Sequence, residues 1–262
     1  MKIKMLQLAV CLLCLQGTAG AEMFNNPSQN VGKKNLFVGL EYATTDHEYE
    51  LDTNTAVPIS SERISLKVTA GLADWLDLYV KGGGADMTQD YKDTNANVVS
   101  NYESDKSAGI GLGGRMRLLN FEDSRTRLFL TAAAYYFKTD SQYETYNSSV
   151  DREIVYRDMR WLDLSFGAGI AKRIDFVDLN AGVGFHEVKW WMKDRIERVQ
   201  GNASSFIRKD WRDSFEMQDP VFGFIGIDFI LPNAYVFSAQ AGITDIDQTQ
   251  FNVSISQGLR RD

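Results

Sequence analysis

Residues 64–81 read ISLKVTAGLADWLDLYVK, and this stretch decides the fold. Apolar and polar residues alternate through its first half, and the alternation resumes after Ala73-Asp74. A period of two residues is typical of a β-strand with one apolar and one polar face. Because only a few residues separate the two runs, the stretch predicts two antiparallel strands joined by a tight turn.

The same alternation recurs along the chain and predicts ten strands, near residues 36–43, 64–70, 76–81, 110–118, 127–135, 162–170, 177–185, 221–230, 235–243 and 250–257. The links between these runs alternate in length. Of the five odd-numbered links, four are long and polar (45–59, 86–106, 139–156 and 187–219) and the last, 244–248, is short. The even-numbered links, centred on 73–74, 120–126, 171–173 and 231–233, are all short. This pattern is typical of an outer-membrane β-barrel with long loops outside and short turns in the periplasm.

The N-terminus predicts an export signal. Lys2 and Lys4 precede an apolar run of residues 5–15, and Ala19-Gly20-Ala21 forms a cleavage site. We therefore expect a signal peptide at 1–21, a short periplasmic segment at 22–34 and a barrel at 35–259. Both cysteines lie in the signal, so disulfides and thiol chemistry are not expected in the mature chain.

Charge and hydropathy narrow the function classes. Without Lys2 and Lys4 the chain keeps 26 Lys and Arg against 35 Asp and Glu, a net charge of −9, which argues against nucleic-acid binding. No mature segment is long and apolar enough to predict a membrane helix.

A soluble lipocalin-like barrel or sandwich is the alternative fold. The alternating link lengths and the export signal favour an all-β, antiparallel, up-and-down transmembrane barrel in the cell outer membrane.

The polar face of the predicted strands carries balanced charge. Its members form a predicted lumen network of Glu41, Lys67, Asp77, Lys81, Arg115, Arg117, Arg127, Asp163, Asp178 and Asp228. Unpaired charge in a confined space is costly, so five acids and five bases suggest ion pairs across a narrow lumen. Two interpretations stay open: a network that closes the lumen, and a small water-filled pathway lined by the network.

Two histidines are the candidates for catalysis at the barrel rim. His47 falls in the first long link, and His186 at the outer end of the seventh strand, beside Glu187. A general acid–base pair needs a positioned partner, and no Asp-Asp or Asp-x-His constellation of the omptin type accompanies them. No spaced ligand cluster predicts a metal, so neither catalytic residues nor cofactors are expected.

The longest link is basic and aromatic. We expect it to contact outer-leaflet lipopolysaccharide through charge-assisted hydrogen bonds and stacking, using Trp190, Trp191, Lys193, Arg195, Arg208 and Trp211. The alternative is an ordinary solvated loop of mixed charge.

Patterns such as Gly71-Leu72-Ala73-Asp74-Trp75-Leu76-Asp77-Leu78-Tyr79-Val80 make the chain resemble small bacterial outer-membrane β-barrels, the OmpA-type and porin-like group. The resemblance is architectural and covers roughly residues 35–259. It implies outer-membrane lipids and the barrel assembly machinery as partners. Many members end in an aromatic residue that this machinery reads, whereas this chain ends in Arg260-Arg261-Asp262, so Phe251 or Leu259 would have to substitute.

Three functions follow in order of preference. The first is a non-enzymatic integral outer-membrane protein with a structural or surface-interaction role. The second is a narrow porin for small solutes, and the third is a rim enzyme acting on lipid or peptide. The ligand and the oligomeric state are not determined by these patterns.

Overall fold

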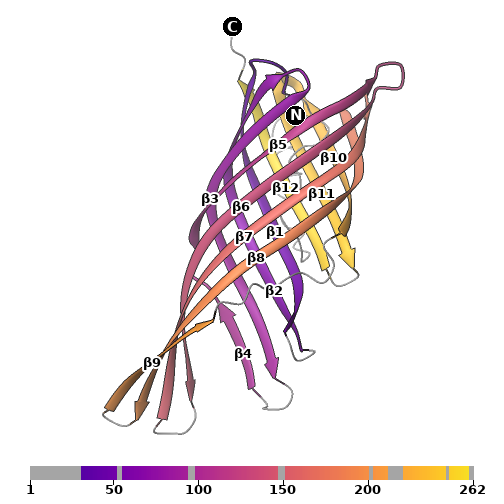
Figure 1. The fold of residues 1–262 in the computed structure, drawn as a ribbon. Helices are drawn as coiled ribbons and strands as arrows, with labels where there is room; N and C mark the ends of the chain where they lie inside the picture. The colour runs from indigo at the N-terminus through magenta and orange to yellow at the C-terminus, as the bar shows by residue number, and fades with distance from the viewer. Residues whose placement is uncertain are drawn as a thin grey trace, which may run out of the picture.

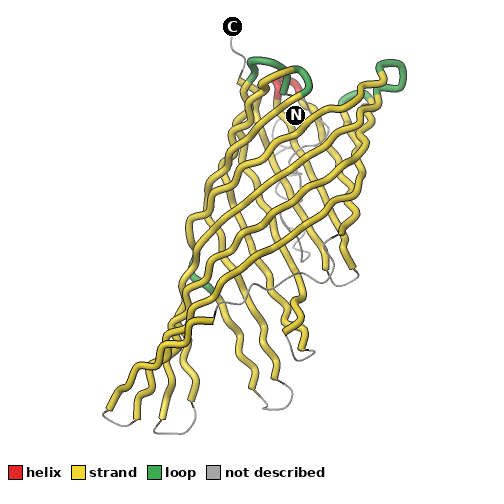
Figure 2. Tube along the Cα trace, in the orientation of Figure 1, coloured by secondary structure: helices red, strands yellow, loops and turns green. Residues whose placement is uncertain are grey.

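A computed structural model describes residues 31–51, 55–93, 98–146, 151–200, 203–211, 221–245 and 248–259. The predicted signal peptide at 1–21, and residues 22–30 of the predicted N-terminal segment, lie outside these residues. The described part is almost entirely β-structure, drawn as arrows in Figure 1 and as yellow tube in Figure 2. None of its helices is long and apolar enough to cross a membrane.

Ten strands form a closed ring. They are β1 (Leu36–Leu51), β2 (Thr55–Ala73), β3 (Leu76–Asp93), β5 (Ser107–Phe121), β6 (Thr126–Tyr146), β7 (Asp151–Ile174), β8 (Val177–Gln200), β10 (Val221–Leu231), β11 (Tyr235–Asp245) and β12 (Gln248–Leu259). Each pairs antiparallel with the next, and β1 pairs with β12, from Leu36 opposite Leu259 to Thr45 opposite Gln250. The predicted antiparallel ten-stranded barrel is therefore confirmed.

Short turns join the strands at one end of the barrel, which we name the turn end. The turns lie at Asp74-Trp75, at residues 122–125, at Asp175-Phe176 and in the short helix η1 (Pro232–Ala234). Asp175 and Asn233 have φ of 53° and 65°, a left-handed conformation that Asp and Asn tolerate better than most residues. The predicted short links are therefore short turns, with the third displaced from 171–173 to 175–176 because β7 is longer than expected.

The opposite end, which we name the extension end, corrects the prediction of long loops. Most of the predicted loop residues are strand, because β6, β7 and β8 continue past the ring as one sheet. Two further strands lie at this end: β9 (Ala203–Trp211) extends this sheet by pairing with β8, whereas β4 (Val98–Glu103) pairs with β3. The extension projects to the lower left in Figure 1. Pairing satisfies the backbone hydrogen bonds that a loop would leave to water.

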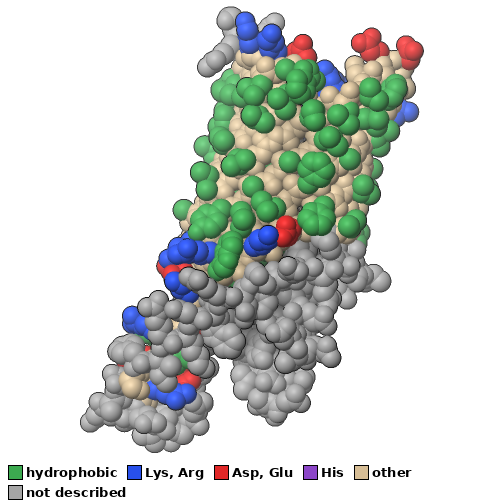
Figure 3. Space-filling view, in the orientation of Figure 1, with side chains coloured by type: hydrophobic (Ala, Val, Ile, Leu, Met, Phe, Trp, Pro, Cys, Tyr) green, Lys and Arg blue, Asp and Glu red, His purple; other side chains and the backbone are tan. Residues whose placement is uncertain are grey.

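The wall has its apolar face outside. Large apolar side chains lie on the outer surface with exposed fractions of 54% to 67%, including Ile64, Val80, Ile110, Val183 and Ile225. On the face drawn in Figure 3, hydrophobic side chains form a green band around the barrel. Alternate residues on the same strands are charged and buried, such as Lys67 and Lys81 at 3% and 4%. This polarity is the reverse of a soluble barrel and suits a lipid environment.

Candidate functional site

The lumen is the candidate functional site, because most of the buried charge of the described residues lies there. At the extension end it begins with a cluster of buried side chains from five strands: Ile59, Ala85, Met87, Tyr135, Phe137, Met159, Trp161, Val188 and Trp190. The rings of Phe137 and Trp161 stack with centroids 5.8 Å apart. This outer apolar cluster fills the mouth that faces the extension.

Glycines on the lumen face of β5 make room for large rings from its neighbours. A Cβ at Gly111 would lie 2.7 Å from the Tyr135 ring, and one at Gly113 would lie 2.4 Å from Tyr79. A larger residue at position 111 or 113 would push these rings aside. The sequence therefore sets small residues against large ones, which packs the lumen closely.

One ion pair crosses the lumen. Arg63 Nη1 on β2 donates to Asp163 Oδ2 on β7 at 2.8 Å. Three strands separate β2 from β7 on one side of the ring and five on the other, so the pair joins nearly opposite walls. His186 Nε2 lies 2.5 Å from the second oxygen of Asp163. The guanidinium also lies over the Tyr135 ring, 4.9 Å from its centroid. All three members of the bridge are buried.

A second group of charges lies beside this bridge. Glu41 accepts hydrogen bonds from Lys67 and from Lys81, whose Nζ lies 2.5 Å from Oε1. Lys81 Nζ also lies 5.4 Å from the centre of the Tyr135 ring. The contact with Tyr135 joins this group to the cross-lumen bridge through a shared aromatic face.

A third group of charges lies in the lumen towards the turn end. Arg115 donates to Asp77, and the backbone N–H of Val31 donates to the same carboxylate at 3.2 Å. Val31 is 9% exposed, so the described start of the chain lies inside the barrel mouth. The hydrogen bond from Lys34 N to Gly71 O, at 3.0 Å, ties this segment to β2.

The same end holds a buried pair of carboxyl groups on neighbouring strands. Asp178 and Asp228 are direct partners in the register of β8 and β10. Asp178 forms an ion pair with Arg127 at 2.8 Å. It also accepts two hydrogen bonds from Arg173, from Nη2 at 2.7 Å and from Nε at 2.9 Å. Asp228 is 1% exposed and has no ion pair within 4 Å among the described residues. Among the described residues, both arginines of this group contact Asp178 and neither contacts Asp228.

The structure differs from the predicted charge network at two basic positions. Arg117 lies near the turn end, where Nη2 donates to the Asp74 carbonyl at 2.6 Å, outside the lumen groups. Arg63 takes part instead, although the sequence analysis placed the start of its strand one residue later. The alternation of buried residues continues to Ser61 and Ile59, so a longer strand would have included Arg63.

The histidine predictions also need correction. His186 is 1% exposed and bound to Asp163, so it lies inside the lumen and not at the rim, where the sequence analysis placed it. The signal was present, because His186 continues the inward set of Asp178, Asn180 and Gly182. His47 lies on β1 opposite Ile59, but its side chain is outside the described part. Among the described residues, no group of three or more His, Cys, Asp or Glu is placed to hold a metal.

The predicted surface-loop residues fall into three sets. Trp190 belongs to the outer apolar cluster at 2% exposure, which corrects its placement on the surface. Trp191, Lys193 and Arg195 are exposed on the outer face of β8. The side chains of Arg208 and Trp211, on β9, lie outside the described part of the structure. The error with Trp190 arose because a strand, and not a loop, continues past His186 and alternates faces.

An exposed apolar wall surrounds a buried charged interior, and the sheet closes on itself. The fold is a closed antiparallel β-barrel with its apolar face outside, an arrangement typical of outer-membrane barrels. A closed ring leaves no unpaired strand edge within the apolar band, which is the condition for a sheet to cross a bilayer.

No protein-family model and no curated protein matches the chain. Among solved structures, the translocator domain of the autotransporter NalP from Neisseria meningitidis is similar with a TM-score of 0.45 and 10% identity, covering 87% of this chain and 89% of that one. An outer membrane channel from Pseudomonas putida F1 is similar with a TM-score of 0.45 and 10% identity, covering 91% of this chain and 100% of the channel. The outer membrane protein OprG from Pseudomonas aeruginosa is similar with a TM-score of 0.43 and 12% identity, covering 88% of this chain and 99% of OprG.

Proposed function

We propose that the protein is an integral outer-membrane barrel with a closed lumen, and that it acts through its surface. The turn end then faces the periplasm and the extension faces outward, as in other bacterial barrels with short periplasmic turns. This role is the structural or surface-interaction function preferred from the sequence.

The ion pair between Arg63 and Asp163 carries the proposal. It joins nearly opposite walls at 2.8 Å, under an outer apolar cluster whose members are at most 2% exposed. A water-filled pathway at this level would expose the charged groups, yet Arg63 and Asp163 are 2% and 0% exposed. Buried, paired charge supports a lumen that is packed and closed.

A narrow channel is the second candidate, and one observation favours it. The lumen face of β11 and β12 is polar, with Ser238, Gln240, Asn252 and Ser254 in register. Both amide atoms of Gln240 and the Asn252 amide nitrogen are buried without a hydrogen-bond partner among the described residues. Groups of this kind could serve a polar solute passing along that wall.

Conductance separates the two candidates. The protein is refolded into lipid bilayers, with insertion checked by a heat-modifiable gel shift, and single-channel current is recorded. The closed barrel predicts no steady channel, whereas Phe137→Ala with Trp161→Ala should admit ions because it removes the stacked rings of the outer apolar cluster. A steady, reproducible channel in the unmodified protein would exclude the closed lumen and establish the narrow channel.

The rim enzyme is the third candidate, and the placement of His186 counts against it. A general base must reach its substrate within hydrogen-bond distance. His186 and Asp163 are 1% and 0% exposed inside the lumen, so a lipid or peptide at the rim would not reach them.

A further inference from the structure

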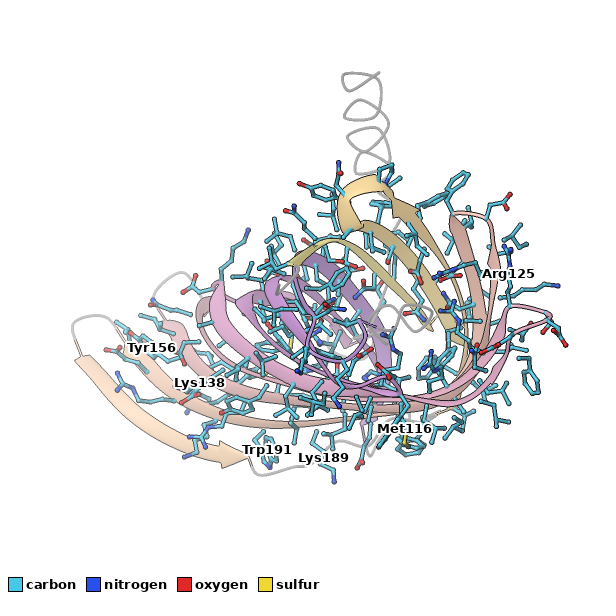
Figure 4. The ribbon with its side chains drawn as sticks, turned by 90° about the horizontal axis from the view of Figure 1, so that it is seen from above. Met116, Arg125, Lys138, Tyr156, Lys189 and Trp191 are labelled. Carbon is cyan, nitrogen blue, oxygen red and sulfur yellow. The ribbon has the colours of Figure 1, made fainter. Side chains whose placement is uncertain are left out.

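Basic side chains gather on the outer face of β6, β7 and β8, just beyond the apolar band. We name this set the basic rim patch: Lys138, Arg160, Lys189, Lys193 and Arg195. Lys138, Arg160 and Trp191 are direct neighbours in the strand register. Blue side chains lie below the green band in Figure 3, and Lys189 and Trp191 point away from the wall in Figure 4.

Part of the patch is available to a ligand. Arg160 and Lys193 are exposed, and neither has an ion pair with another described residue. Lys138 is paired with Asp158 at 3.2 Å and Asp140 at 3.3 Å. The hydrogen bond to Asp158, together with the charges of both acids, raises the pKa of the Lys138 ammonium.

Two further acids lie beside the patch: Glu187, which pairs with Lys189 at 2.9 Å, and Glu197, two residues beyond Arg195 on the same outward row of β8. Five bases therefore lie beside four acids. On the outer face of β1 to β3, the described charged residues beyond the apolar side chains include the acids Asp46, Glu62 and Asp86. Burial, together with the Glu62 charge, raises the pKa of Asp46. The described outer face therefore carries these acids on β1 to β3 and the basic rim patch on β6 to β8.

An apolar hollow lies in the barrel wall, with one edge at Ala134 and Phe166 towards the patch and the other at Leu76 and Met116 near the turn end. Its volume is about 690 Å³, and its lining includes small residues, Gly114, Ala132 and Ala134, bordered by Leu112 and Phe166. Ala134 and Lys138 lie on the same outward row of β6, with Tyr136 between them at 39% exposure. At about 3.4 Å per residue, Ala134 and Lys138 are roughly 14 Å apart along the strand.

We propose that the basic rim patch and this hollow together bind one molecule of lipopolysaccharide from the outer leaflet. Arg160, Lys193 and Lys189 would bind the phosphates of its lipid anchor, and Trp191 and Tyr136 would lie against its sugars. One acyl chain would fill the hollow between Ala134 and Phe166. Charge-assisted bonds from Arg and Lys are the strong contacts that phosphate accepts, and Trp and Tyr suit the border between apolar and wet surroundings.

Two features favour this ligand. A free phosphate would use only the basic residues and would leave the hollow without a role. A lipid with a small neutral headgroup would use only the hollow. The adjacency of both features on β6 fits a lipid that carries several acyl chains and several phosphates. This inference rests on the outer-membrane location proposed above.

Binding is measured by native mass spectrometry on protein refolded in detergent, titrated with deep-rough lipopolysaccharide, phosphatidylglycerol or inorganic phosphate. We expect one lipopolysaccharide per barrel, with phosphatidylglycerol bound at least tenfold more weakly. R160A/K189A/K193A should weaken lipopolysaccharide binding at least tenfold, and A134F several-fold. The matched controls are K33A/K106A/K172A, which removes three exposed charges elsewhere, and A241F on β11, and both should bind within twofold of the unmodified protein.

Three results would overturn the site. They are unchanged binding by R160A/K189A/K193A, equal loss in the control variants, and full competition by millimolar inorganic phosphate, which would indicate a simple anion site. Insertion is followed separately by the heat-modifiable shift in phosphatidylcholine vesicles. A barrel that inserts but does not select lipopolysaccharide refutes this site alone, whereas failure to insert refutes the proposed function.

Discussion

Asp163 is the residue on which the lumen depends most. Its two carboxylate oxygens are occupied from different strands, one by Arg63 at 2.8 Å and the other by His186 at 2.5 Å. Removing one member of a buried ion pair leaves the other charge desolvated without compensation. The bridge therefore tests both stability and closure.

Asp163→Ala should lower the free energy of unfolding by about 3–5 kcal/mol, because the Arg63 guanidinium stays buried without its carboxylate. The double variant Arg63→Met with Asp163→Ala should lower the free energy of unfolding by less than the sum of the two single variants. Urea unfolding in vesicles, followed by tryptophan fluorescence, measures this double-mutant cycle. Additive single changes would show that the two side chains do not interact in the membrane.

Glycine at 113 tests the close packing of the lumen wall. A Cβ there would lie 2.4 Å from the Tyr79 ring and 2.6 Å from the Ala132 carbonyl oxygen. We expect Gly113→Ala to destabilise the barrel by roughly 1–3 kcal/mol through overpacking. Gly84→Ala is the matched control, because no atom lies within 4 Å of its added Cβ, and its effect should stay within about 0.5 kcal/mol. Equal unfolding midpoints for the two variants would contradict the packing.

At the scale of elements, the extension is a sheet that depends on its own contacts. Beyond the ring, β7 and β8 are held by the bidentate pair of Arg157 with Asp194 at 2.8 and 2.7 Å, which is largely buried. Arg198 and Glu153 form a pair further out, but Arg198 is 50% exposed. Exposed pairs contribute little to stability, so the first pair should matter more.

Arg157→Ala should raise the rate of trypsin cleavage in the extension several-fold while leaving the heat-modifiable shift of the barrel unchanged. The physical reason is local opening of the sheet, which frees backbone for the protease without unfolding the ring. Arg198→Ala should change the rate less than twofold. The local role of the Arg157 pair is refuted if both variants are cleaved equally, or if Arg157→Ala melts the barrel.

At the scale of the whole molecule, closure joins the two ends of the chain. Leu40 on β1 faces Ile255 on β12 across the seam, and both side chains are exposed on the outer wall. This seam is the longest-range pairing in the ring and leaves no free edge in the band. It also keeps the described start of the chain, at Val31, beside the turn end.

A cysteine pair at the seam tests closure. Leu40→Cys with Ile255→Cys, in protein lacking residues 1–21, should form a disulfide on mild oxidation and shift its gel mobility until reduced. Leu40→Cys with Ile225→Cys is the control, because Ile225 lies on β10, two strands beyond β12. An open sheet would leave both pairs uncrosslinked.

Much of this molecule follows from local pattern. The period of two residues determined which side chains face out, as with Ile64 and Lys67, because successive residues of a strand point to opposite faces. Short turns at Ala73-Asp74 and near Leu231 fixed the antiparallel order. The ten strands and the fold class were accessible in this way.

Other features needed the tertiary structure. The sequence cannot show that Arg63 meets Asp163 a hundred residues later, because that contact depends on how the register staggers around the ring. Nor does it show that Trp190 and His186 are buried. The residues after 185 are mostly polar, so the sequence pattern predicts a loop there and not the continuation of β8. The sequence by itself determined a barrel with a charged interior. Only the tertiary structure decided that an ion pair spans this interior and that a basic wall borders an apolar hollow, because both join strands that are distant in the chain.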